Sequence, residues 1–193
     1  MADRILAAQS AFSELKPVKS AAFSVALRED LSMASITAGK GKVADVRAAM
    51  QSAYALDLPD TARRVEGNGI CIIWHGPDQW IAMAERGANG RDLERELMPL
   101  LAGLAAVVDQ SDGRAVVRVS GTRIRDVLAK GIPVDLHPRA FASNGVAITH
   151  ASHIGIILWQ TDAAPVYEIA MFRSFADSFA GWLMHSAAEF TGH

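Results

Sequence analysis

The chain has 193 residues, half of them apolar, and its 19 Lys and Arg residues against 21 Asp and Glu residues give a net charge of −2. This length suits one domain or two small lobes that share a core. The balanced charge, with no block of like charge, excludes the basic surface that a nucleic-acid partner requires.

The N-terminus and the single cysteine bear on where the protein works. Residues 1–20 predict an arm that orders only against something else, since Pro17 breaks any helix there. This N-terminus lacks the apolar core of a signal peptide, and no run reaches the roughly 18 apolar residues of a membrane helix. Cys71 is the only cysteine, so no intrachain disulfide forms. We therefore expect a cytoplasmic protein that has no membrane partner.

The first half of the chain reads strand, turn, helix, strand pair, helix. The runs "FSVAL" and "MASITA" predict two strands, and apolar residues at helical spacing predict a helix at 42–56 that Pro59 closes. "ICIIW" and "WIAMA" predict a strand pair around the turn sequence at 75–78. Leucines on one side predict a second helix at 91–101.

The second half repeats this order. "AVVDQS" and "RAVVRVS" flank Asp112-Gly113, which predicts a β-hairpin. "GTRIRDVLAKG" predicts a turn and a short helix, and "GVAITH", "GIILWQ" and "VYEIAM" predict three strands. A last helix runs from about Ser174 to Phe190, with an aromatic stripe that predicts a core-facing side.

Because the two halves follow one pattern, we predict an α+β fold made of duplicated ferredoxin-like halves. "SITAGKGKVADVRAAM" corresponds to "VRVSGTRIRDVLAK", and "GRDLERELMPLL" corresponds to "RSFADSFAGWLM". The expected organisation is an N-terminal arm at 1–20 and one domain at 21–193. Its two pseudo-repeats would cover about 21–105 and 106–193.

Two glycine-rich stretches do not complete a nucleotide-binding motif. "AGKGKV" lacks the Walker pattern, because Ile36 and Val43 stand where a glycine and a Ser or Thr are needed. "GNGICI" carries Ile72 in place of the third glycine of the dinucleotide fingerprint. We predict that these glycines make turns and that this chain has no cofactor-binding residues.

Candidate metal ligands and nucleophiles are also incomplete. His150 and His153, or Cys71 and His75, could each supply two zinc ligands, whereas a site needs three or four. No Gly-x-Ser-x-Gly elbow occurs in the sequence. We therefore predict no metal ligand in this chain.

The stretch "KGIPVDLHPRAF" at 130–141 raises the question of whether its polar groups are a catalytic cluster or a shaped loop that a partner grips. Two prolines stiffen it, and rigid loops with Arg and aromatic tips suit protein interfaces. We predict that Asp135 braces the loop and that Asp135, His137, Arg139 and Phe141 form a partner interface. The chain would then hold no catalytic residue.

A family resemblance runs through "VVDQSDGRAVVRVSGTRIRDVLAKGIPVDL". Its spacing is similar to that of the folate-binding domain of glycine-cleavage aminomethyltransferases, in which an Asp-x-Ser hairpin, a Ser-Gly strand end and an aspartate follow in order. The matching residues are Asp109, Ser111, Val119, Ser120, Gly121, Leu128 and Asp135. Over about residues 70–190, "GPDQW", "LAKGIPVDLHPRAF" and the C-terminal "FRSFADSFAGWLMHSAAEF" resemble the gamma-subunit family of heterotetrameric sarcosine oxidase more closely still.

This resemblance implies a non-catalytic subunit that contributes to assembly and stability, with a folate-binding-domain-like fold of the aminomethyltransferase type. It implies alpha, beta and delta subunits as partners, and FAD, FMN, NAD and tetrahydrofolate on those partner subunits rather than on this chain. The implied reaction of the complex is oxidative demethylation of sarcosine to glycine, with the one-carbon unit passed to tetrahydrofolate.

Two other functions stay open at this point. The first is a stand-alone, folate-dependent aminomethyltransferase-like protein in which Asp135 is the catalytic carboxylate near a folate amine. The second is a folate-binding iron–sulfur maintenance protein of the same fold, which carries a Lys-Gly-Cys-Tyr segment. Cys71 lies in "GICIIW" instead, which argues against the second function.

Overall fold

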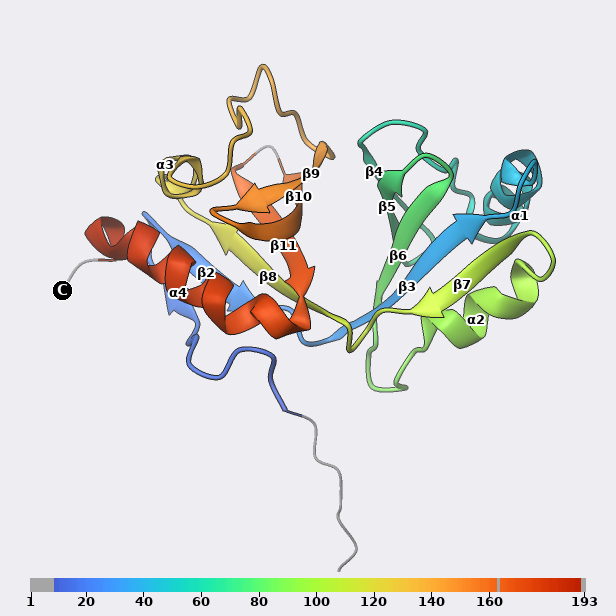
Figure 1. Cartoon of the computed structure of the whole chain (residues 1–193), viewed down its shortest axis with the longest axis horizontal. Helices are drawn as coiled ribbons and strands as arrows, with labels where there is room; N and C mark the ends of the chain where they lie inside the picture. The colour runs from blue at the N-terminus through green and yellow to red at the C-terminus, as the bar shows by residue number, and fades with distance from the viewer. Residues whose placement is uncertain (1–8, 163, 192–193) are drawn as a thin grey trace, which may run out of the picture.

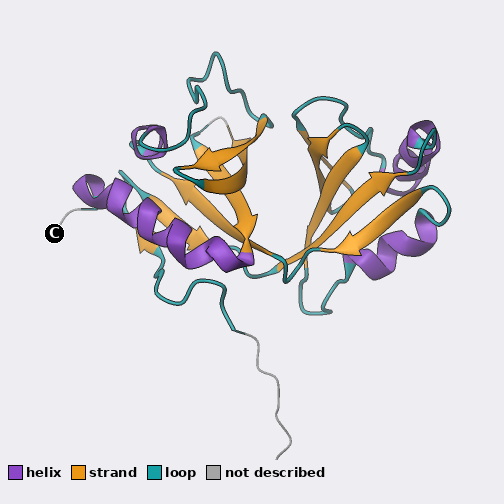
Figure 2. Cartoon of the chain, viewed as in Figure 1, coloured by secondary structure: helices purple, strands orange, loops and turns teal. Residues whose placement is uncertain are grey.

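The computed structural model describes residues 9–162 and 164–191. Its strands form two antiparallel sheets that meet at an angle, with the helices on their outer sides (Figures 1 and 2). No helix within these two ranges is long and apolar enough to cross a membrane.

The first sheet has five strands in the order β4-β5-β6-β3-β7. They are β3 (Leu31–Ala38), β4 (Arg64–Gly67), β5 (Ile70–Gly76), β6 (Gln79–Glu85) and β7 (Ala105–Asp109). Helices α1 (Val43–Tyr54) and α2 (Leu93–Leu100) cover its outer face. Asp92 is the N-cap of α2, and its side chain accepts a hydrogen bond from the Arg95 N–H.

The second sheet has six strands in the order β1-β2-β8-β11-β10-β9. They are β1 (Val18–Lys19), β2 (Ser24–Leu27), β8 (Arg114–Ser120), β9 (Val146–Ala151), β10 (Ile154–Asp162) and β11 (Val166–Phe172). Helix α3 (Ile124–Ala129) and helix α4 (Ala176–Ala187) lie on its outer face, and the short 3-10 segments η1 (Arg173–Phe175) and η2 (Ala188–Phe190) flank α4.

Three apolar clusters hold these layers together. One lies between the five-stranded sheet and α1 and α2, and a second lies between the six-stranded sheet and α3 and α4. The third lies between the sheets and includes Met33, Ile73, Val116 and Ile157. The α+β fold and the strand and helix pattern expected in each half are thus confirmed, as four layers with the sheets inside.

The predicted hairpin at Asp112-Gly113 is wrong. The strands on either side of it exist, but β7 pairs with β3 and β8 pairs with β2 and β11, so they belong to different sheets. The segment between them is a crossover. The Asp109 carboxylate accepts hydrogen bonds from the Ser111 N–H and hydroxyl at 3.0 and 2.6 Å, and the Ser111 hydroxyl oxygen accepts the Met33 N–H at 3.0 Å. β8 lies inside its sheet, between β2 and β11, and residues on both of its faces are buried. A two-stranded hairpin would not bury both faces.

The N-terminal part of the chain completes the six-stranded sheet. β2 pairs with β8, with Val25 opposite Val119. In the five-stranded sheet, β7 pairs with β3 in the corresponding way. In the expected arm, residues 1–8 lie outside the described residues, whereas Phe12 and Leu15 are buried in the core beside α4. The repeat boundaries at 21–105 and 106–193 remain a prediction. In the structure, β2 belongs to the sheet that contains the strands of the second repeat.

Candidate functional site

The loop 130–141 uses its polar groups on its own backbone. The Asp135 carboxylate accepts a hydrogen bond from the His137 N–H at 2.9 Å, and the His137 Nδ1 accepts one from the Arg139 N–H at 3.2 Å. Such local bonds replace backbone partners in a turn. The side chains of Asp135, His137 and Arg139 are exposed to solvent. The structure therefore brings these three predicted residues together on one projecting loop. Among the described residues, no other acidic or basic side chain is bonded to the Asp135 carboxylate.

Phe141 departs from its expected position at the tip of the loop. Its side chain is 7% exposed, and its ring lies 6.4 Å from the ring of Tyr167 in the core. Burial of an aromatic ring at the loop base fixes the loop to the sheet. Of the four residues predicted for a partner interface, Asp135, His137 and Arg139 are thus exposed and Phe141 is buried.

A hollow of about 490 Å³ lies between α3 and this loop. Pro133 and Asp135 line it on the loop side, and Arg125 lines it from α3. The Arg125 Nε donates to the Tyr167 hydroxyl at 3.0 Å, and burial raises the pKa of that hydroxyl. Asp135 therefore lines an open hollow in which the Arg125 Nε is already bonded to Tyr167.

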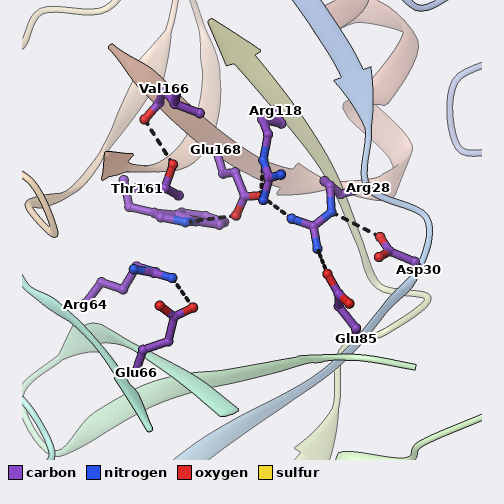
Figure 3. A network of polar contacts seen from close by, with 10 residues as sticks. Arg28, Asp30, Arg64, Glu66, Glu85, Arg118, Thr161, Val166 and Glu168 are labelled. Atoms are coloured by element: carbon purple, nitrogen blue, oxygen red, sulfur yellow. Dashed lines mark hydrogen bonds and ion pairs between the residues drawn. The ribbon is translucent and has the colours of Figure 1, made fainter. Parts of the chain in front are cut away.

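A second polar site, which the sequence patterns did not reveal, lies between the two sheets (Figure 3). Glu168 on β11 is buried, and both of its carboxylate oxygens accept hydrogen bonds. Arg28 and Arg118 donate to Oε1, the latter through Nη2 at 2.7 Å, and Trp159 Nε1 donates to Oε2 at 3.1 Å. A buried carboxylate is tolerated when its lone pairs are satisfied in this way.

Arg28 links this carboxylate to the other sheet. Its guanidinium contacts Asp30 at 3.1 Å and Glu85, at the end of β6, at 3.3 Å (Figure 3). Burial opposes the charge, but hydrogen bonds and Coulombic attraction to Asp30 and Glu168 raise the pKa of Arg28 above its ordinary value. The network therefore acts as a polar brace between the sheets.

The cavity beside this brace measures about 590 Å³, and its charges balance. Three arginines and three glutamates line it: Arg28, Arg64, Arg118, Glu66, Glu85 and Glu168. Arg64 pairs with Glu66 and donates to Asn144 Oδ1 at 2.9 Å. Cys71 also lines the cavity, and burial raises the pKa of its thiol to about 12, so this thiol is not a nucleophile near neutral pH.

The histidines do not gather into a metal site. No group of three or more His, Cys, Asp or Glu side chains that could hold an ion occurs among residues 9–162 and 164–191. His153 Nδ1 lies 3.1 Å from the hydroxyl of Ser152. Burial, together with the positive charge of Arg114, lowers the pKa of His75.

One sequence signal could have revealed the brace. Glu168 is the single charged residue in the apolar strand "VYEIAM", and a lone acid in such a strand is rarely buried without a cationic partner. Its partners stand 140 and 50 positions away in the chain, so their identity requires the strand order.

Solved structures share this architecture. The glycine cleavage system aminomethyltransferase T from Bartonella henselae matches with a TM-score of 0.62 and 14% identity, covering 85% of this chain and 46% of that chain. At this identity the likeness concerns the fold alone. The protein is thus an α+β protein of the aminomethyltransferase-type, folate-binding-domain-like class, as the sequence predicted.

Other relatives fix the family. A chain of the heterotetrameric sarcosine oxidase from Corynebacterium sp. U-96, in complex with pyrrole 2-carboxylate, matches with a TM-score of 0.79 and 27% identity over 92% of this chain and 90% of that one. Sarcosine oxidase subunit gamma from Arthrobacter sp. is 34% identical, and that from Corynebacterium sp. strain P-1 is 36% identical. Each match spans 146 residues, 74% of this chain and 70% of the relative.

The model of the family described as "Sarcosine oxidase, gamma subunit family" matches residues 39–189. The chain therefore belongs to the sarcosine oxidase gamma subunit family, and the resemblance found in the sequence is confirmed.

Proposed function

We propose that this chain is the non-catalytic gamma subunit of a heterotetrameric sarcosine oxidase and that it contributes to the assembly and stability of the complex. The observation that carries this proposal is the match to a chain of the Corynebacterium complex, which extends over 92% of the present chain. The match covers nearly the whole length of both chains, so the present chain has the scaffold of that chain of the complex.

The chemistry of the described side chains supports a non-catalytic role. General acid–base or nucleophilic catalysis needs a group that is free to exchange a proton or attack a substrate. Glu168 is saturated by three donors, and burial raises the pKa of the Cys71 thiol to about 12. Asp135 is exposed on a loop and not enclosed in a dry pocket.

The partners under this proposal are the alpha, beta and delta subunits, and the complex works in the cytoplasm. FAD, FMN, NAD and tetrahydrofolate would bind to those subunits. The complex would oxidise sarcosine to glycine and pass the one-carbon unit to tetrahydrofolate, while the present chain holds no cofactor.

A stand-alone aminomethyltransferase-like activity is the alternative, and one observation favours it. Asp135 lies at the rim of a hollow large enough for part of a pterin, on a fold shared with aminomethyltransferase T. The exposure of this carboxylate weighs against it, because a catalytic aspartate needs enclosure and a bound substrate to act.

Co-expression with the neighbouring genes tests the proposal. The chain is captured through a tag on its C-terminus, and the visible spectrum of the captured material is recorded. We expect larger chains to co-purify with a flavin absorption band. Recovery of the chain alone, while the larger chains assemble an active oxidase without it, would overturn the proposal.

A further inference from the structure

An exposed aromatic surface lies where β11 ends and β8 begins. Phe172 and Phe175 are 53% and 46% exposed, and they stand on either side of Arg173 and Ser174. The guanidinium of Arg114 lies 4.8 Å from the centre of the Phe172 ring. We call the set Arg114, Phe172, Arg173 and Phe175 the Arg114 surface.

The strand register explains why this surface is apolar. Phe172 is opposite Arg114, and two positions along the same strands Ala170 is opposite Val116. Since alternate residues share a face of a sheet, Phe172 and Arg114 continue the face that Ala170 and Val116 bury between the two sheets. Phe172 is 53% exposed, so the apolar inner face of the six-stranded sheet reaches solvent at this end of the strands.

Arg114 has no ion-pair partner in the described part of the chain, and its Nε is buried there without a hydrogen-bond partner. Burial lowers the pKa of its guanidinium, and its positive charge in turn helps to lower the pKa of His75. A desolvated guanidinium without an acceptor is unfavourable, so an added anion would gain free energy at this position.

The cavity beside Arg114 is cationic and opens next to the phenylalanines. It measures about 220 Å³, and four arginines and two acids line it: Arg28, Arg86, Arg114, Arg173, Glu29 and Asp112. Arg28 is already paired with Glu168, which does not line this cavity. The remaining charged residues are three arginines and two acids, so the cavity has a net positive charge. A neighbouring hollow is lined by Phe172, Phe175 and Arg173, so the charged cavity and the aromatic surface are continuous.

We propose, building on the function proposed above, that the Arg114 surface docks a partner subunit of the oxidase, which inserts a carboxylate side chain toward Arg114 and packs apolar residues on Phe172 and Phe175. Arginine and aromatic side chains carry much of the binding energy at protein interfaces. The Arg114 guanidinium can donate two N–H hydrogen bonds to one carboxylate, and the two rings would exclude water around this contact.

Reconstitution tests this proposal. The wild-type chain and its variants are purified and titrated into the assembly of the remaining subunits, and the dissociation constants are compared. Arg114→Gln removes the charge, and Phe175→Ala removes exposed apolar area. We expect Arg114→Gln to weaken binding about tenfold or more, as the loss of a buried charged partner does, and Phe175→Ala to weaken it similarly through lost apolar contact. Arg114→Lys keeps the charge without the fork, and we expect an intermediate affinity.

Two matched variants control for general effects. Met98→Ala removes a side chain on α2 that is 55% exposed, and Arg47→Gln removes a guanidinium on α1 that pairs with Asp57. We expect both to bind as the wild type does. Thermal unfolding of each variant, followed by circular dichroism, checks that the chain is folded.

The outcomes separate this proposal from the proposed function. If the wild-type chain does not bind the other subunits, the proposed function fails. If the wild type binds and the Arg114 and Phe175 variants bind equally well, only the Arg114 surface is overturned. A dimer of the isolated chain that Phe175→Ala abolishes would assign the surface to a second copy and would also overturn the proposal.

Discussion

Arg28 and Glu168 form an ion pair at the place where the chain leaves the six-stranded sheet for the five-stranded one. Arg28 follows β2 directly, and its guanidinium also reaches Glu85 on the five-stranded sheet. Their side chains are 12% and 5% exposed, so solvent screens the pair little. This contact fixes the relative positions of the two sheets.

Glu168→Gln should destabilise the fold strongly. The substitution leaves the guanidiniums of Arg28 and Arg118 facing a neutral amide, and breaking a buried pair in this way costs about 3 kcal/mol. Urea unfolding followed by tryptophan fluorescence measures the loss. Asp45→Asn is the control, because its pair with Lys42 is a surface contact in which the two side chains are 53% and 47% exposed. A loss below about 1 kcal/mol for Glu168→Gln would show that the brace is not a main contributor.

Gly121→Ala should prevent β2 from docking normally on β8. Gly121 has a φ of 126°, and a Cβ there would lie 2.3 Å from the Ala22 carbonyl oxygen. A backbone clash combined with an unfavourable φ costs several kcal/mol, on the order of 3. Gly155→Ala is the control, since a Cβ at Gly155 meets no atom within 4 Å. Equal melting temperatures for the two variants would contradict this assignment of Gly121.

Glu96 should make the stability of the first half depend on pH. Arg91 donates to both oxygens of Glu96 at 2.8 and 2.7 Å, and the Tyr54 hydroxyl donates at 2.6 Å. Hydrogen bonds from Arg91 lower the pKa of Glu96 below its ordinary value of 4.5, against the effect of burial, with a further contribution from Tyr54. A depressed carboxyl pKa stabilises the folded state above the ordinary value, and this stability is lost as the pH falls through the lowered pKa.

Glu96→Gln tests this dependence. The free energy of unfolding of wild type and variant should differ above pH 4.5 and converge in stronger acid. The difference should be modest and should shrink with added salt, because the Glu96 side chain is 35% exposed. A difference that stays constant from neutral to strongly acidic pH would be inconsistent with this role of Glu96.

Asp135→Asn should leave turnover of the assembled oxidase unchanged. The asparagine Oδ1 can still accept the hydrogen bond from the His137 N–H, so the loop keeps its shape. Asp135→Ala removes that acceptor and should cost about 1 kcal/mol of stability. Steady-state kinetics on the assembled complex separates the two roles, because a hundredfold loss with Asp135→Asn would indicate that the carboxylate takes part in catalysis.

Local pattern was enough to predict most elements, because strands and helices follow from the spacing of apolar residues. The helix expected at 42–56 occurs at Val43–Tyr54, and the strand pair around residues 75–78 occurs as β5 and β6. The hairpin at Asp112-Gly113 failed for a tertiary reason. The Asp-Gly turn is compatible with either a hairpin or a crossover, and the hydrogen bonds between Ser111 and Met33 select the crossover.

The polar sites were harder to predict, because their members are far apart in the chain. Asp135, His137 and Arg139 lie within five positions and were recognised together. Glu168 meets Arg28 only because β2 and β11 both pair with β8. The position of Phe141 was hard to predict for a different reason. A phenylalanine in a polar loop can point to solvent or into the core, and here its packing near Tyr167 places it in the core.

The most direct test of whether this subunit has catalytic activity of its own is an assay of sarcosine oxidation. The assay is run on the lone chain and on the complex that the chain captures, with the same concentration of the chain in both samples. We expect the lone chain to be colourless and inactive, with or without tetrahydrofolate, and the captured complex to oxidise sarcosine. Turnover of sarcosine by the lone chain, or transfer of a one-carbon unit to tetrahydrofolate by it, would contradict a non-catalytic role.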